Sequence, residues 1–102
     1  ATDLKVSGSA PIVEVSWKPT YSDNLMYFLV YKFEKGQPVD VSDPSAIVAK
    51  LHYENDETMS YYDKDGRKGD FTYAVTAVSR NNIESPAVSQ AVKVTKTAVK
   101  TK

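Results

Sequence analysis

The chain has 102 residues, which suits one domain with a single core and leaves no room for a second. Thirteen basic residues balance thirteen acidic ones, so the chain lacks the positive field that non-specific binding to nucleic acid or to an anionic membrane requires. It contains no cysteine, which excludes a disulfide framework, a thiol nucleophile and a cysteine-ligated zinc site.

Apolar residues alternate with polar ones in short segments that Gly, Pro, Asn and Asp separate, a pattern that predicts an all-β domain. Residues 4–6 form the first predicted strand. The second, residues 13–17, alternates along its whole length and places Val13, Val15 and Trp17 on one buried face. We therefore expect Trp17 to be an anchor of the core.

The third predicted strand, residues 26–33, is apolar or aromatic on both faces, as in the centre of a sheet. One face carries Phe28 and Val30. The other carries a candidate interaction surface, which we call the outer row: Tyr27, Leu29, Tyr31 and Phe33. Three interpretations of this row stay open: a platform for sugar rings, a contact surface for another domain, or a face that the protein's own side chains cover.

Four more strands are predicted at residues 47–51, 59–63, 71–78 and 88–94. Seven short strands at a spacing near ten residues favour a two-sheet Greek-key sandwich. The predicted core consists of Val13, Val15, Trp17, Phe28, Val30, Tyr61, Tyr73, Val75 and Ala77.

The end of the chain, KTAVKTK, is rich in lysine and has little apolar mass to offset the entropy of ordering it. We therefore assign residues 1–94 to the domain and residues 95–102 to a flexible tail or linker stub. The chain begins at Ala1, as a processed protein or a segment of a longer one would.

Several of these residues together resemble the fibronectin type III fold, an immunoglobulin-like β-sandwich. They are Trp17 on the second strand, Phe28, Val30, Tyr31 and Lys32 on the third, Tyr61 and Asp63 before a glycine-bearing turn, and Tyr73, Val75 and Ala77 on the sixth. The sequence departs from the family pattern at Phe71, where a tyrosine hydroxyl would hydrogen-bond to the backbone.

The segments VYKFEKGQPVDVSDPSAIVAKL, YYDKDG and FTYAVTAVSRNNIESPAVS are similar to accessory fibronectin type III modules of secreted bacterial glycoside hydrolases of the family-ten-like group. This resemblance implies a non-catalytic spacer or docking module of a larger protein that is extracellular, periplasmic or on the cell surface. The implied partner is a neighbouring domain of the same parent chain, through protein–protein contact. No nucleic acid and no membrane insertion are expected.

Two alternatives to the spacer stay open. A carbohydrate-binding module would need exposed rings, and Tyr21, Tyr53 and Tyr62 are candidates besides the outer row. A cell-surface adhesion module would use Lys68-Gly69-Asp70, which is one step from Arg-Gly-Asp. In adhesive modules, Arg-Gly-Asp lies between the sixth and seventh strands. In this chain, Lys68-Gly69-Asp70 comes before the sixth strand, so we predict that it forms an ordinary turn.

No catalytic or metal site is predicted, and no cofactor is expected. Asp63, Asp65 and Asp70 offer oxygen donors, but Gly66 falls at the fourth position of the loop instead of the sixth that an EF-hand-like calcium loop needs. His52, the one histidine, has no partner at a spacing typical of a base or a metal ligand. The domain is therefore predicted not to be an enzyme.

Overall fold

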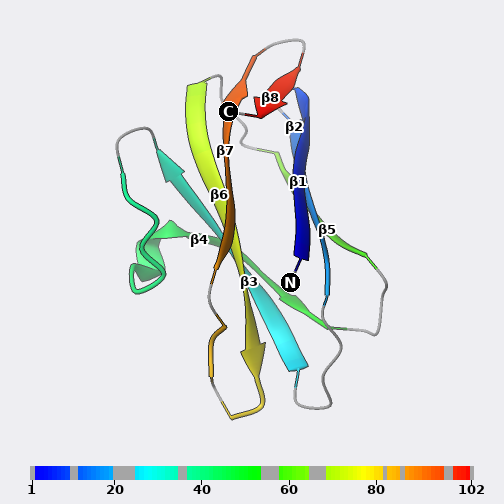
Figure 1. Ribbon diagram of the computed structural model, residues 1–102, viewed down its shortest axis with the longest axis vertical. Coiled ribbons are helices and arrows are strands. Elements are labelled where there is room, and N and C mark those ends of the chain that lie inside the picture. The colour runs from blue at the N-terminus through cyan, green and yellow to red at the C-terminus, as the bar shows by residue number, and fades with distance from the viewer. Residues whose placement is uncertain are drawn as a thin grey trace.

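The computed structural model describes residues 2–9, 12–19, 25–34, 37–53, 58–64, 69–81, 83–85, 87–95 and 98–101. Over these residues the protein is all-β, with two antiparallel sheets (Figure 1). A 3-10 turn, η1 (Pro44–Ala46), precedes the fourth strand. This part of the chain contains no α-helix, and so no helix that could cross a membrane.

The strands are β1 (Thr2–Ser9), β2 (Ile12–Lys18), β3 (Leu25–Glu34), β4 (Ile47–His52), β5 (Met59–Asp63), β6 (Gly69–Ser79), β7 (Val88–Val94) and β8 (Val99–Thr101). The three-stranded sheet has the order β1-β2-β5, and the five-stranded sheet has the order β4-β3-β6-β7-β8. The chain changes sheet between β2 and β3, between β4 and β5, and between β5 and β6. The two sheets form separate layers of a body that measures 40 × 26 × 20 Å (Figure 1).

Side chains from both sheets meet in one core, as in a β-sandwich. Most of the predicted core residues are fully buried: Val13, Val15, Trp17, Phe28, Val30, Tyr73 and Val75. Tyr61 and Ala77 are half-buried and pack against the margin of the core. Tyr61 is less covered than expected because β5 is an edge strand of its sheet.

The expected tail contains a strand. β8 pairs with β7 through three residues, among them Val99 opposite Val94. The turn before β8 is closed by Thr95, whose N–H donates to the carbonyl oxygen of Ala98 at 2.9 Å and whose Oγ1 accepts from the N–H of Ala98 at 3.1 Å. Val99 also packs against the core. A lysine-rich composition therefore does not prevent order here, because one valine and a polar turn hold the segment in place.

Trp17 is fully buried, and its ring meets that of Phe28 edge-on with centroids 5.5 Å apart. We expect Trp17→Ala to lower the free energy of unfolding by ~3–5 kcal/mol in denaturant melts, since it leaves a large cavity between the sheets. Ile12→Ala on the same strand is the control, because Ile12 is exposed and should cost less than ~1 kcal/mol. Equal losses in the two variants would contradict the placement of Trp17.

Candidate functional site

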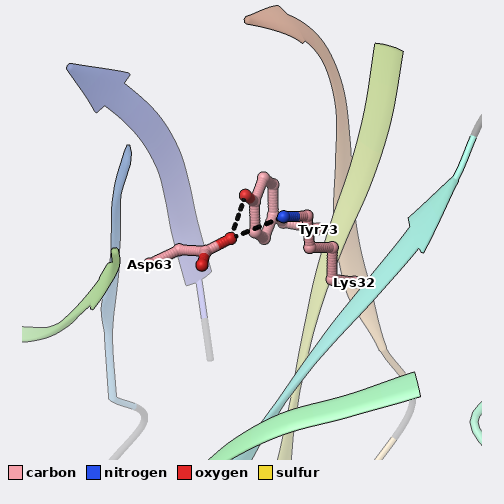
Figure 2. A network of polar contacts seen from close by, with 3 residues as sticks. All are labelled: Lys32, Asp63 and Tyr73. Carbon is pink, nitrogen blue, oxygen red and sulfur yellow. Dashed lines mark hydrogen bonds and ion pairs between the residues drawn. The ribbon is translucent and has the colours of Figure 1, made fainter. Parts of the chain in front are cut away.

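A polar network crosses from one sheet to the other (Figure 2). Nζ of Lys32 on β3 lies 2.8 Å from Oδ2 of Asp63 on β5, and the hydroxyl of Tyr73 on β6 donates to the same oxygen at 2.6 Å. The side chains of Lys32 and Asp63 are 12% and 5% exposed. Two opposite charges therefore meet almost out of contact with water, one from each sheet.

Strand alternation explains how these charges come together. Lys32 follows Phe28 and Val30 on the inward face of β3, and Asp63 follows Tyr61 on the inward face of β5. The ammonium group of Lys32 also lies 4.5 Å from the centroid of the Phe71 ring. Lys32 and Asp63 are opposite charges at inward positions of two strands, so the alternation of the sequence was enough to predict an ion pair between the sheets.

The tyrosine hydroxyls at the network keep their protons at neutral pH. Burial, together with the hydrogen bond to Asp63, raises the pKa of Tyr73 far above its ordinary value. Burial and the nearby Asp63 carboxylate also raise the pKa of Tyr61. A general acid or base works best with a pKa near the working pH. Tyr73 therefore stays protonated at neutral pH and donates its hydrogen bond to Asp63.

A pocket of about 390 Å³ opens beside the network, between β5 and the segment that contains η1 and the start of β4. It is lined by Lys32, Glu34, Ser45, Ala46, Val48, Tyr61 and Asp63. The ion pair forms part of its wall, so a ligand bound there would compete with contacts that the protein makes to itself. The pocket alone therefore defines no ligand class.

The outer row is not an exposed surface. Tyr31 and Phe33 are only 1% and 2% exposed, and their rings stack on each other with centroids 6.1 Å apart. Residues of the β3–β4 connection, of the start of β4 and of the β6–β7 connection pack against these rings: Val41, Ala46, Ile47 and Ala87. The expectation of an interaction surface is therefore wrong for Tyr31 and Phe33, because the chain folds back over its own sheet.

The other end of the outer row is half-buried. Leu29 packs against the cluster formed by Tyr31 and Phe33. Nζ of Lys50 lies 4.3 Å from the centroid of the Tyr27 ring, and the ring of His52 lies 6.3 Å from it. Of the three interpretations of the row, cover by the protein's own side chains describes it best.

Glu84 makes a partly buried contact that sequence reasoning missed. Its Oε2 accepts hydrogen bonds from the hydroxyls of Tyr31 and Thr76, each at 2.5 Å. An isolated bridge to Val78 holds the backbone of Glu84 over the end of β6. The partial signal in the sequence was Thr76 between apolar Ala74 and Val78 on the outward face of β6. An apolar outward face predicts a cover, and a covered hydroxyl needs a partner.

Tyr62 is the one aromatic side chain that is largely exposed in the described part of the chain, at 53%. It lies on the outer face of the three-stranded sheet, opposite Glu14 on β2. A hydrogen bond between its hydroxyl and the Glu14 carboxylate raises the pKa of Tyr62. Oγ of Ser7 donates to Glu14 at 3.4 Å, and exposed Ile12 shares the face. The side chain of Tyr62 on β5 is thus fixed by its contact with Glu14 on the neighbouring strand.

The other sequence candidates that the structure describes do not assemble into a site. Gly69 and Asp70 begin β6 and pair with Val94 and Lys93, so they are not at a loop tip. Lys68, Asp65 and Tyr21 lie outside the described residues. Within the described chain, no group of three or more His, Cys, Asp or Glu side chains could hold a metal ion.

Comparison with models of protein families, with curated proteins and with solved structures gave no match.

The covered outer row predicts a pH effect. Burial, reinforced by Glu84, raises the pKa of Tyr31 from 10.0 to about 12. Between these pH values the unfolded chain has lost this proton and the folded protein has kept it, so stability should fall by up to ~1.4 kcal/mol per pH unit. Well below pH 10, Tyr31 keeps its proton in both states and should not contribute to the pH dependence of stability. Tyr31→Phe should remove its share of the slope in denaturant melts from pH 9 to 12, and identical slopes would contradict the burial of Tyr31.

Proposed function

We propose that this domain is a fibronectin type III-like module that acts as a non-catalytic spacer or docking module in a larger secreted bacterial protein, with a glycoside hydrolase as the expected parent. Its action is positional: a stiff body sets the distance and the angle between the domains that flank it. The neighbouring domain of the same parent chain is its partner, and its location is extracellular, periplasmic or on the cell surface.

The arrangement of the strands supports this proposal. Strands β1 to β7 divide three and four between the two sheets, and β8 adds to the edge of the larger sheet. The repeated change of sheet suits the Greek-key connection that the resemblance implies. Trp17 at the centre of the core agrees with the same family pattern.

The observation that carries the proposal is a single apolar core shared by both sheets, together with an ion pair that joins them. Apolar side chains of both sheets form one cluster, and the Lys32–Asp63 pair joins the sheets beside it. Directional contacts of this kind resist sliding of one sheet over the other, which apolar contact alone does not. An elongated body of 40 × 26 × 20 Å that keeps its shape is what a spacer needs.

Carbohydrate binding is a second candidate, and Tyr62 is the observation that favours it. An exposed ring beside the Glu14 carboxylate offers a face for stacking and an acceptor for a sugar hydroxyl. One ring is a small surface, and most other described aromatic side chains are buried or half-buried. The adhesion alternative has less support, because Asp70 belongs to a strand.

The spacer role is tested by placing the chain between two fluorescent reporter domains and measuring single-molecule energy transfer. We expect one narrow distance distribution. A Gly/Ser linker of the same length is the control. Its end-to-end distance should be broadly distributed, with a root-mean-square value of about 50–60 Å. A distribution as broad as that of the linker would contradict the spacer role.

Native gels of the domain test the carbohydrate alternative. We expect no retardation of the domain in native gels that contain soluble xylan or hydroxyethyl cellulose. Retardation of the wild type that is lost in Tyr62→Ala would replace the spacer by a carbohydrate-binding module. Ile83→Ala is the matched control, because Ile83 is also exposed but lies in the β6–β7 connection.

A further inference from the structure

The two sides of the sandwich differ. On one side, β7 and β8 lie against β1 (Figure 1). The other side lies between β4 and β5, which are edge strands of their sheets. There, the pocket of about 390 Å³ opens beside the Lys32–Asp63 pair. Small-molecule sites have volumes of about 300–1,000 Å³, so this pocket has room for a molecule the size of one ring.

The ion pair in the wall limits the charge of a ligand. An anion would compete with Asp63 for Lys32, and a cation would compete with Lys32 for Asp63. Either exchange would leave an almost buried charge without its counter-charge, which is strongly unfavourable. Glu34, the other charged residue of the lining, is exposed, so an ion pair with it would contribute little. A neutral molecule therefore suits the pocket better than an ion.

Tyr61 and Ser45 supply neutral hydrogen-bonding groups to the pocket. Tyr61 is half-buried, and no hydrogen bond joins its hydroxyl to another residue of the described chain. Burial and the Asp63 carboxylate raise its pKa, so this hydroxyl keeps its proton and can donate at neutral pH. Oγ of Ser45 donates to Oδ1 of Asp43 at 2.6 Å, and its lone pairs can accept from a ligand. A ligand hydroxyl would therefore meet both a donor and an acceptor.

The remaining wall of the pocket is apolar. It is formed by the ring of Tyr61 and the side chains of Ala46 and Val48. The turn η1 fixes the position of this wall, because Oδ1 of Asp43 caps it by accepting from the N–H of Ser45 at 3.0 Å. A saturated ring that carries hydroxyl groups has apolar C–H faces and a polar rim. Such a ring matches both kinds of wall.

We propose that the pocket between β4 and β5 binds a single neutral polyhydroxylated ring, a free monosaccharide or a cyclitol, with the Tyr61 hydroxyl as donor and Oγ of Ser45 as acceptor. Tyr61 lies on the inner side of β5, whereas Tyr62 lies on the outer face of the same sheet. The pocket therefore differs from the surface that the carbohydrate alternative would use. This inference does not depend on the spacer role.

NMR titration of the full chain with D-glucose and with myo-inositol tests the proposal. We expect saturable shifts of the backbone amides at residues 45–48 and 59–63, with a dissociation constant of about 1–10 mM for a ligand of this size. The ratio of the two dissociation constants tells a monosaccharide site from a cyclitol site. The proposal is overturned if neither ligand gives saturable shifts, or if the shifts lie elsewhere in the chain.

Two variants test the walls of the pocket. Tyr61→Phe keeps the ring and removes the hydroxyl, so it should weaken binding by about fivefold or more. Val48→Trp fills the pocket and should abolish binding. Val39→Trp is its control, because Val39 is similarly exposed, at 42% against 39%, and does not line the pocket. Binding that is unchanged in Tyr61→Phe and in Val48→Trp would contradict the proposed site.

Two small ions test the charge of the ligand. Titration with n-butylammonium and with butyrate should give weaker binding than the better of the two neutral ligands. Tighter binding of either ion would overturn the proposal. Sugar binding that is lost in Tyr62→Ala and kept in Tyr61→Phe would also overturn it, because the sugar would then lie on the outer face of the three-stranded sheet.

Discussion

The ion pair between Lys32 and Asp63, with the hydroxyl of Tyr73 bound to the same carboxylate oxygen, is the constraint on which the two-sheet body depends. Apolar contact between sheets is strong but has no preferred direction, so alternative sheet orientations with a similar buried area compete with the native one. A buried ion pair contributes little net stability compared with a well-packed apolar pair, because desolvation offsets the attraction. Its contribution here is positional: only one placement of β5 against β3 and β6 satisfies both charges and the hydroxyl. The proposed spacer role would gain from such a contact, because that role needs a fixed geometry.

The outer side of the five-stranded sheet is fixed by a second carboxylate. Glu84 binds Tyr31 and Thr76, and the β3–β4 connection covers the same rings from the other side. β3 and β6 are therefore covered on both faces, which explains why β3 carries apolar or aromatic residues on both faces. This cover removes the aromatic row from the list of exposed surfaces. Among the described residues, Tyr62 stays exposed on the outer face of the three-stranded sheet, where Glu14 holds it, and β8 covers only part of the edge of β7.

Alternation in the sequence was enough to predict an all-β domain and the burial of Trp17, because the inward face of each strand is a local property with a period of two. The same pattern contained the inward positions of Lys32 and Asp63, so the cross-sheet pair could have been predicted as well. The cover of the outer row could not, since Glu84 meets Tyr31 from 53 residues away and nothing local marks that contact. β8 was missed for another reason: composition measures average apolar content, whereas one valine opposite an open strand edge is enough to order a short segment.

A double-mutant cycle on the cross-sheet pair tests this account most directly. The free energies of unfolding of the wild type, Lys32→Met, Asp63→Asn and the double variant are measured in denaturant under identical conditions. Each single change removes one side of a buried ion pair and should cost ~3–5 kcal/mol. The double variant should cost at least ~1.5 kcal/mol less than the sum of the two single losses. Losses that add within ~0.5 kcal/mol would contradict the account, because they would mean that Lys32 and Asp63 do not act as one contact between the sheets.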